Sequence, residues 1–431
     1  METNMKLEKT NTQVLAEPTL GVMDKIIRTL FLKKMSTLET GKLEIIECFN
    51  GFEKHHIFGS KKSPDDLHST LKIFNPQFYS RILFGGSIGA GESYIDKDWE
   101  TSNLAQLIQL FARNRDLQTG LDKGLGWLMA PSRKIYHLLN KNSISGSKKN
   151  IHAHYDLGND FFKLFLDKNW MYSAAIFKTQ ETSLDDAQFE KVDRICRKLK
   201  LKPDDRVIEI GTGWGGFALH AAKHYGCHVT TTTISKEQYK VAVDRIEQAG
   251  LSDRVTILLQ DYRLLEGTYD KLVSIEMIEA VGLNFLETYF TKCSSLLKPH
   301  GEFLLQAITI RDQNFIAAKK SVDFIQRYIF PGSGIPSIES IINATSSCTD
   351  LQLAHLEDFG FDYAKTLHIW NDRLETHKNV ILQQGYPESL HRMWQFYFGY
   401  CEGGFLERSI GVSQIHFLKP DQRIDIKGDP V

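Results

Sequence analysis

The chain has 431 residues, which exceeds the length of one ordinary domain and suggests two. Hydrophobic residues make up 42% of it, charged residues 24%, and only 11 residues are proline, which excludes collagen-like, low-complexity and largely disordered proteins. The formal net charge of −1 provides no global field that would attract nucleic acid or another highly charged partner. Any function that depends on charge must therefore arise from local clusters.

The six cysteines are widely spaced, with no CxxC pair and no His/Cys cluster at the spacing of metal ligands. We therefore expect no metal centre, and a reduced, cytoplasmic compartment is the simplest interpretation. The N-terminus lacks the apolar run and cleavage site of a signal peptide, and nowhere do 18 apolar residues follow one another. The sequence thus predicts a protein that neither spans a membrane nor enters the secretory route.

The first third of the chain predicts a small domain of its own. Short strand-like stretches precede a glycine-rich stretch at 85–91 and a helix at 104–113. A linker-like, serine-rich segment at 143–147 places the boundary near residue 150, which gives domains 1–150 and 151–431. The predicted strands of the first domain are 42–48, 55–58 and 70–74.

Charge is distributed unevenly between these domains. Residues 1–150 hold 21 Lys and Arg against 16 Asp and Glu, and most of this positive excess lies between Arg113 and Lys149, beside Trp127 and several aliphatic residues. Such a segment can attach a protein to an anionic bilayer, with about 1 kcal/mol from each cation near the surface. A solvated helix with one core-facing stripe is an equally good interpretation.

From residue 205 strands and helices alternate, which predicts a parallel sheet covered by helices. One predicted helix is 236–249. Between 310 and 406 an aromatic-rich insertion interrupts the alternation and is suited to cover a site at the carboxyl ends of the strands. The predicted strands are 206–210, 228–232, 255–259, 271–275, 302–308 and 411–417.

A glycine loop follows the first of these strands. Gly211, Gly213, Trp214 and Gly215 belong to a G-x-G-x-x-G-like turn between strand and helix, where glycines let a cofactor approach the backbone. The pattern alone admits a dinucleotide site, an S-adenosylmethionine site or a tight turn without ligand. The next strand ends in threonines without the carboxylate that a dinucleotide ribose requires, which disfavours NAD.

Three residues favour S-adenosylmethionine. Asp261 and Tyr262 follow the third strand, where a carboxylate and a ring suit the amine and the face of an adenine. Glu209 stands next to the glycine loop, and its charge suits a positively charged cofactor better than phosphates. S-adenosylmethionine carries such a charge on its sulfur.

Several motifs in order resemble the cyclopropane-fatty-acyl-phospholipid synthase family, which includes the mycolic acid cyclopropane synthases. The resemblance extends from about residue 150 to 417, and residues 89–99 resemble the N-terminal domain of the bacterial phospholipid enzymes. The motifs are residues 153–162, residues 171–173, the glycine loop with Trp214, residues 233–238, Glu279 and residues 328–332.

The resemblance implies an α/β class I methyltransferase fold, which is a Rossmann-like sheet with helices on both faces, together with a small N-terminal lipid-binding domain. Matching positions imply contacts with S-adenosylmethionine from Tyr172, Ser173, Gly211, Gly213, Thr233, Gln238, Asp261 and Tyr262. Glu209, Trp214, Gly215 and Ile234 complete the predicted cofactor site.

The family's substrate is a cis double bond in an acyl chain of a membrane phospholipid, a poor nucleophile that must be aligned with the sulfonium methyl group. Methyl transfer leaves a carbocation, so the site must exclude water and offer ring faces or carboxylates. A base then removes a proton, either from the added methyl group, which closes a cyclopropane ring, or from elsewhere, which leaves an alkene.

In the family a bound bicarbonate is the base, and the resemblance implies its contacts here at Ala174, Glu279, Gln306, Ile308 and Tyr363. Ala174 replaces a cysteine, which is harmless if the backbone amide makes the contact. Gln306 replaces a histidine; it can hydrogen-bond bicarbonate but cannot carry a proton.

Glu276 stands where the family generally has glycine, and Ala280 replaces a histidine. Two acids three residues apart can raise each other's pKa, so Glu276 and Glu279 are candidates for a protein base. Alternatively, Glu276 meets only the cofactor or a solvated edge. Cys401 matches a proposed active-site cysteine of the family, but the chemistry needs no thiolate, and a small core residue is the stronger interpretation.

The sequence thus predicts an enzyme that uses S-adenosylmethionine to convert unsaturated phospholipid acyl chains into cyclopropane fatty acids, peripherally at the inner membrane and without nucleic acid. A homodimer is implied by the bacterial relatives. Alternatives are a methyl-branched or methylene product, including a step toward furan fatty acids, and a small-molecule C- or N-methyltransferase. A lipid-binding protein without catalysis is a third alternative.

Overall fold

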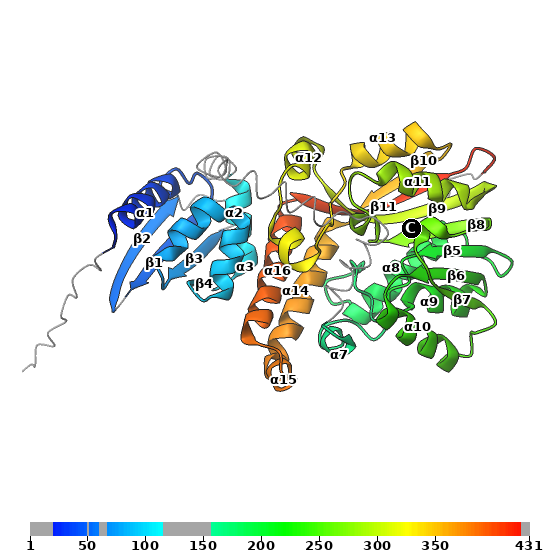
Figure 1. Cartoon of the computed structure of the whole chain (residues 1–431), viewed down its shortest axis with the longest axis horizontal. Coiled ribbons are helices and arrows are strands. Elements are labelled where there is room, and N and C mark those ends of the chain that lie inside the picture. Colours follow the sequence, from blue (N-terminus) through cyan, green and yellow to red (C-terminus); the bar gives the residue numbers. More distant parts are fainter. Residues whose placement is uncertain (1–19, 50, 60–66, 115–156, 424–431) are drawn as a thin grey trace, which may run out of the picture. The chain divides into compact units, whose positions relative to one another are not determined.

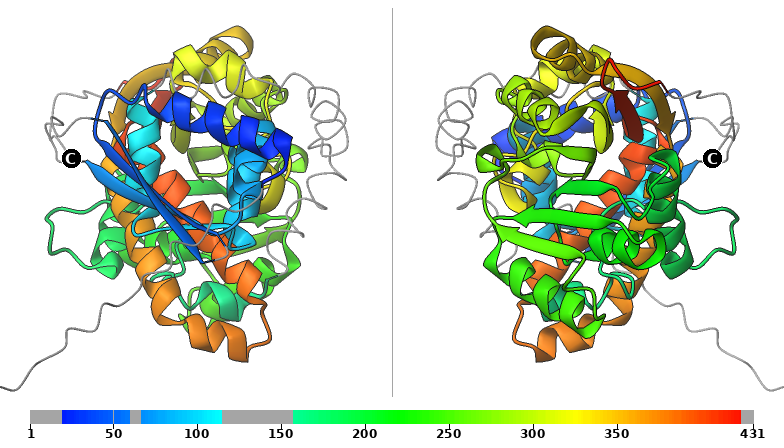
Figure 2. Two further views of the ribbon diagram at one scale, coloured as in Figure 1. Left: turned by 90° about the vertical axis from the view of Figure 1, so that its left-hand side faces the viewer. Right: turned by 90° about the vertical axis from the view of Figure 1, so that its right-hand side faces the viewer.

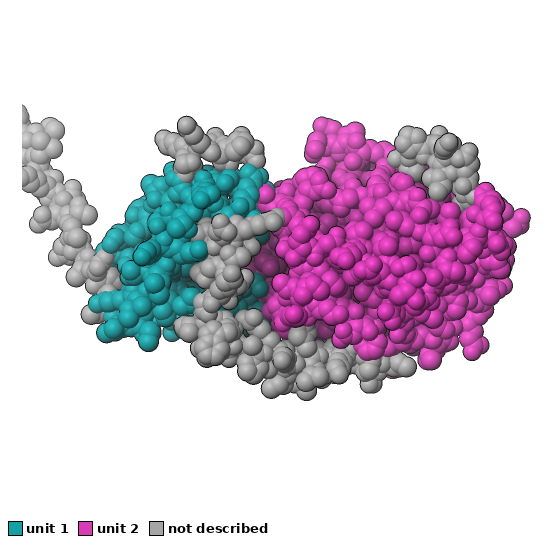
Figure 3. Space-filling view, turned by 90° about the horizontal axis from the view of Figure 1, so that it is seen from above, with its two compact units in different colours: residues 1–126 teal, residues 127–431 magenta. Residues whose placement is uncertain are grey.

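The computed structural model describes residues 20–49, 51–59, 67–114 and 157–423. The chain divides into two compact units, residues 1–126 and residues 127–431 (Figure 3). The boundary predicted near residue 150 lies outside the described residues, as do the basic segment from residue 115 onward and the motif residues before 157. Within the described ranges, no helix combines the length and apolar composition needed to cross a bilayer.

Unit 1 contains a four-stranded sheet in the order β2-β1-β3-β4. β1 pairs antiparallel with β2 and parallel with β3, and alternate residues of β1 are buried, as expected for a sheet with one face against a core. The predicted helix 104–113 is present with the same bounds, and the three predicted strands are present with shifted or longer bounds. The elements are α1 (Val22–Met35), β1 (Lys42–Phe49), β2 (Phe52–Gly59), β3 (His68–Ile73), α2 (Gln77–Ile95), β4 (Trp99–Thr101) and α3 (Leu104–Arg113).

Unit 2 contains a seven-stranded sheet in the order β10-β11-β9-β8-β5-β6-β7 (Figure 1). Strands β5 to β9 are parallel to one another, and β11 is antiparallel to both of its neighbours. The strands are β5 (Arg206–Ile210), β6 (His228–Thr233), β7 (Val255–Leu259), β8 (Tyr269–Ile275), β9 (Leu297–Ile310), β10 (Gln352–Asp358) and β11 (Ile410–Leu418).

Helices cover both faces of this sheet (Figure 2). One hydrophobic cluster joins the sheet to α8, α9 and α10, and a second joins it to α11 and α13, so the strands are buried from two sides, as in a doubly wound fold. These helices are α8 (Leu184–Lys198), α9 (Gly216–Tyr225), α10 (Lys236–Gln248), α11 (Leu286–Ser295) and α13 (Ile338–Cys348).

The aromatic-rich region between β9 and β11 is mainly helical, with α14 and α16 packed against each other. The sequence did not predict that β10 lies within this region and returns to the sheet. β10 is an edge strand whose residues are mostly exposed and include Glu357 and Asp358, so it lacks the apolar run by which buried strands are recognised. The helices are α12 (Asp312–Lys319), α14 (Gly360–Thr376), α15 (Lys378–Gln383) and α16 (Glu388–Leu406).

The strand order places the functional region. From β5 the chain winds through β6 to β7 in one direction, whereas β8 and β9 lie on the other side of β5. Ligands of such sheets bind outside the carboxyl ends of the strands at this change of direction. The glycine loop follows β5 and the two acids follow β8, so both predicted halves of the site lie at this switch point.

Candidate functional site

The glycine loop after β5 has the backbone that only glycine adopts readily. Gly211, Gly213 and Gly215 have φ angles of 104°, 53° and 85°. A Cβ atom on Gly211 would lie 3.2 Å from Cγ of Met277, whereas one on Gly213 would meet nothing within 4 Å. The loop is therefore tightly packed at its start and open at Gly213, where a ligand can approach the backbone.

Glu209 lies on β5 directly before the loop and is 2% exposed. Thr231 Oγ1 donates a 2.6 Å hydrogen bond to its carboxyl group. Burial raises the pKa of Glu209 to about 8, and the hydrogen bond and the charge of Lys191 lower it only in part. A positively charged ligand nearby would favour the ionised form.

The predicted cofactor residues after β6 are linked to one another. Thr233 Oγ1 donates to Oε1 of Gln238 at 3.0 Å, which fixes the amide of Gln238 at the start of α10. Ser235 caps this helix by accepting from the Gln238 backbone N–H. Ile234 lies between them and is partly buried.

The predicted adenine residues after β7 have a partner that the sequence did not reveal. Asp261 accepts hydrogen bonds from Nε of Arg263 at 2.8 Å and from Nη2 at 2.6 Å. The guanidinium group also lies 5.5 Å from the ring centre of Tyr262. Both oxygens of Asp261 are thus held by Arg263, so an adenine amine would share this carboxylate with the guanidinium group.

Trp214 lies in the core. Its side chain is 2% exposed, its Nε1 donates to Oδ1 of Asn159 at 2.8 Å, and its ring lies 5.1 Å from that of Phe162. The indole therefore anchors the loop, and only the backbone of Trp214 is placed to meet a cofactor.

The two acids after β8 accept hydrogen bonds from all of the other residues that the resemblance assigned to the bicarbonate site. Glu276 Oε1 accepts from the backbone N–H of Ala174 and from Nε2 of Gln306, both at 2.8 Å. Its Oε2 accepts from the hydroxyl of Tyr363 at 2.8 Å. Glu279 Oε1 accepts from the backbone N–H of Ile308 at 2.5 Å, and its Oε2 has no hydrogen-bond partner among the described residues.

The electrostatics of the two acids differ. Burial and, to a smaller extent, the neighbouring charge of Glu276 together raise the pKa of Glu279 to about 8. Burial also raises the pKa of Glu276, but hydrogen bonds from Ala174 and Gln306 and the charge of Lys191 oppose this. Within the pair, the three donors to Glu276 favour its ionised form, whereas Glu279 holds a proton more readily.

Gln306 is itself oriented by a neighbour. Its Oε1 accepts a 3.1 Å hydrogen bond from Nε2 of Gln414 on β11, and so its NH₂ group faces Glu276. The glutamine that replaces the family's histidine thus acts as a fixed donor to a carboxylate.

Lys191 is a site residue that the sequence did not reveal. It lies on α8 with 0% exposure, and its Nζ donates to Oγ of Ser173 at 2.7 Å. Burial lowers its pKa to about 8, whereas the charges of Glu276, Asp167 and Glu209 raise it. The sequence offered one signal, because Lys191 is on the same buried face of the helix as the apolar residues Val192 and Ile195. A lysine is rarely buried in this way unless it has a charged partner.

An aromatic cluster surrounds Tyr172. Its ring centre lies 5.4 Å from those of Phe162 and Trp370, and 6.4 Å from that of Trp394. Its hydroxyl donates to that of Tyr397 at 3.2 Å. Trp370 also lies 6.2 Å from the ring of Tyr363, so α14 and α16 join the predicted cofactor residue to the carboxylate pair through ring faces.

Cys401 lies on α16 and is partly buried. Burial and the charge of Asp323 raise the pKa of its thiol, so the thiol keeps its proton at neutral pH. This favours the packing role over a thiolate nucleophile.

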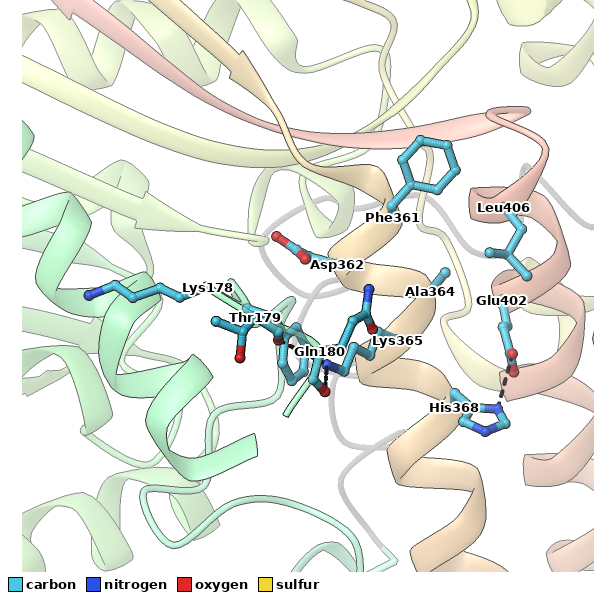
Figure 4. Close-up of a pocket in the computed structure, with 11 residues that line it drawn as sticks. Lys178, Thr179, Gln180, Phe361, Asp362, Ala364, Lys365, His368, Glu402 and Leu406 are labelled. Atoms are coloured by element: carbon cyan, nitrogen blue, oxygen red, sulfur yellow. Dashed lines mark hydrogen bonds and ion pairs between the residues drawn. The ribbon is translucent and has the colours of Figure 1, made fainter. Parts of the chain in front are cut away.

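A hollow of about 690 Å³ lies between α14, α16 and residues 177–180 (Figure 4). The predicted site residues do not line it. Its lysines are already engaged, because Lys365 donates to the carbonyl groups of Thr179 and Gln180 and Lys178 pairs with Glu190. Among the described residues, no three His, Cys, Asp or Glu side chains are grouped to hold a metal ion.

Comparisons with known proteins agree with this geometry. A family model described as mycolic acid cyclopropane synthetase matches residues 142–415. Cyclopropane-fatty-acyl-phospholipid synthase from Escherichia coli is 38% identical over 81% of this chain and 87% of that protein. Tuberculostearic acid methyltransferase UfaA1 from Mycobacterium tuberculosis is 35% identical over 81% of this chain and 83% of that protein.

Solved structures are similar to this chain over most of its length. The cyclopropane synthase MmaA2 from Mycobacterium tuberculosis is 29% identical, with a TM-score of 0.59 over 63% of this chain and 98% of that one. Coclaurine N-methyltransferase, bound to N-methylheliamine and SAH, has a TM-score of 0.56 over 78% of this chain but only 20% identity, so it shows the fold alone.

Proposed function

Because the chain belongs to the mycolic acid cyclopropane synthetase family, we propose that it transfers a methyl group from S-adenosylmethionine to the double bond of an unsaturated phospholipid acyl chain and closes a cyclopropane ring. The observation that carries this proposal is the junction of the aromatic cluster with Glu276 and Glu279 through Tyr363. The predicted family, the class I methyltransferase fold and the S-adenosylmethionine-dependent class of enzyme are confirmed.

The residues at the switch point fit S-adenosylmethionine. The open side of Gly213 admits a ligand to the backbone, and the buried carboxyl group of Glu209 suits a cationic one. Gly211, Thr233 and Gln238 would complete the binding surface. When bound, S-adenosylmethionine supplies an electrophilic methyl group on a positively charged sulfur.

The aromatic cluster suits the carbon skeleton of the substrate. Ring faces such as that of the partly buried Tyr172 bind an acyl chain, exclude water and stabilise positive charge on carbon. Water at this position would trap the carbocation as an alcohol. Packing of Tyr172 against Phe162 and Trp394 therefore keeps water away from the carbocation, so that the cyclopropane ring can close.

A phospholipid substrate is favoured by unit 1. Its helix α1 exposes Val22, Met23, Ile26 and Leu30, which are 79%, 68%, 49% and 56% exposed, and carries exposed Lys25 and Lys33 beside them. Apolar and cationic side chains on one helix suit the surface of an anionic bilayer. We infer that unit 1 associates with lipid peripherally at the cytoplasmic face of the inner membrane.

The test is incubation of the full chain with methyl-labelled S-adenosylmethionine and vesicles of unsaturated phospholipid, followed by mass spectrometry and proton NMR of the acyl chains. We expect label in the lipid and cyclopropane ring protons. A methylene or methyl-branched product would still show methylation of the lipid, but it would mean that the reaction ends in a step other than ring closure. Unlabelled lipid together with bound S-adenosylmethionine would overturn the proposal in favour of a small-molecule methyltransferase.

A further inference from the structure

We propose that the Glu276 carboxylate is the base of this reaction and occupies the place that bicarbonate was expected to take, so that this chain works without bicarbonate. The chemical part of this inference rests on the proposed function. The anion-binding part concerns the protein alone and can be tested without lipid.

Four of the five groups expected to hold bicarbonate donate to carboxyl groups of the protein, and only Oε2 of Glu279 is without a hydrogen-bond partner among the described residues. Ala174 and Tyr363 each have one hydrogen to donate, and both donate to Glu276. Gln306 directs its NH₂ group to the same carboxylate while Gln414 holds its oxygen. The two remaining groups, Glu279 and the Ile308 amide, bond to each other.

The backbone of Glu276 supports a functional role. Its φ angle is 48°, in the left-handed region that favours glycine, which is the residue that the family resemblance predicts here. A side chain in this conformation is unfavourable and persists where its surroundings hold it, typically at functional sites. Three hydrogen bonds to an ionised carboxylate provide that support.

Charge also disfavours a bound bicarbonate. Glu276 and Glu279 are neighbouring acids, and negative charge on Glu276 raises the pKa of Glu279, so another anion would be repelled as well. The buried cation Lys191 is already shared among Glu276, Asp167 and Glu209. The site therefore accommodates the carboxylate of Glu276 and disfavours a further anion such as bicarbonate.

The chemistry needs no stronger base. The added methyl group is bonded to the carbon beside the carbocation, and the cation draws electron density from its C–H bonds, so a carboxylate can remove a proton from it. An oxygen of Glu276 accepts the proton, and the electron pair of the C–H bond forms the third C–C bond of the ring. The proton then passes from Glu276 to solvent, which returns the carboxylate to its starting state.

The test combines a titration with an assay, both in buffer freed of carbon dioxide. Titration of ¹³C-bicarbonate into the protein, followed by NMR, is expected to show no saturable binding to the wild type and saturable binding to Glu276→Gly. In the lipid assay, added bicarbonate should leave the wild-type rate unchanged. Glu276→Gly should lose activity by about 10²-fold and regain it with bicarbonate.

Two further variants separate the carboxylate from the backbone. Glu276→Gln keeps the shape and removes the charge, so it should lose activity without rescue. Lys200→Gly is the matched backbone control, because Lys200 is exposed on the surface and has a φ angle of 50°; it should behave as wild type.

Saturable bicarbonate binding by the wild type, or a wild-type rate that rises with bicarbonate, would overturn the inference. Full activity of Glu276→Gln would do so as well. If no form of the protein methylates lipid, the proposed function fails, while the bicarbonate titration still decides whether Glu276 fills the anion position.

Discussion

Three buried carboxyl groups of unit 2 differ in their hydrogen-bond partners. Glu209, Glu276 and Glu279 are all held where burial raises the pKa, but each has a different partner. Glu209 receives one neutral hydroxyl, Glu276 receives three donors, and Glu279 receives one backbone amide. The number of donors decides which group carries the charge.

We predict that Glu209 makes the cofactor-free protein less stable as the pH rises from about 5 to 8. Its folded pKa is about 8 and its ordinary value is 4.5, so in this range the folded state keeps a proton that the unfolded chain has lost. Glu209→Gln should remove this contribution, so that the free energy of unfolding falls by up to about 4 kcal/mol less between pH 5 and pH 8 than in the wild type. The measurement is urea unfolding at a series of pH values.

The matched control for this variant is Glu237→Gln on the exposed surface of α10, which should keep the wild-type slope. A slope unchanged by Glu209→Gln would mean that Glu209 is ionised in the folded protein.

Sequence analysis identified the residues of the carboxylate pair but not their connections. Glu276 and Glu279 were candidates because they are acids at a strand end. That Ala174, Gln306 and Tyr363 all donate to Glu276 could not be predicted, because these groups come from segments far apart in the sequence. The pairing of Asp261 with Arg263 was missed as well, although the two are only two residues apart.

At the scale of elements, the buried parallel strands could be predicted from the sequence, whereas the edge strand β10 could not. β5 and β7 have the bounds expected from their apolar runs. β10 pairs at the edge of the sheet through backbone hydrogen bonds and carries few apolar residues, so its sequence resembles a loop.

We predict that α1 binds anionic membranes through its exposed apolar side. Ile26→Glu combined with Leu30→Glu should lower association with phosphatidylglycerol-containing vesicles at least about tenfold, since each removes an apolar side chain whose burial contributes about 1.5–3 kcal/mol. Vesicle co-sedimentation is the measurement.

Val380→Glu is the matched control, because Val380 is an exposed apolar residue on helix α15 of the other unit. It should leave vesicle binding unchanged. Equal binding of the α1 variant and the wild type would show that another surface holds the membrane.

At the scale of the whole molecule, the chain combines two units that each have a sheet of their own. Unit 2 contains the glycine loop and the carboxylate pair, whereas unit 1 contains the exposed face of α1. The division into domains 1–150 and 151–431 stays a prediction from the sequence.

We predict that S-adenosylmethionine stabilises unit 2 selectively. At a concentration of 100 times its Kd it should contribute about 2.7 kcal/mol, which raises the Tm of a unit of this size by about 4 °C. Differential scanning calorimetry of the full chain should therefore show one transition that moves with the cofactor and one that does not. A shift of both transitions together would contradict a cofactor site confined to unit 2.

The sequence by itself determined the class of fold, the family and the cofactor, because these depend on local patterns such as apolar periodicity, a glycine loop and short motifs, and it predicted the acids of the site. Only the tertiary structure decided what those acids contact. The partners of Glu276, the buried Lys191 and the aromatic cluster around Tyr172 depend on side chains from distant segments. Their contacts, and the burial that shifts their pKa values, exist only once the sheet and its covering helices have packed.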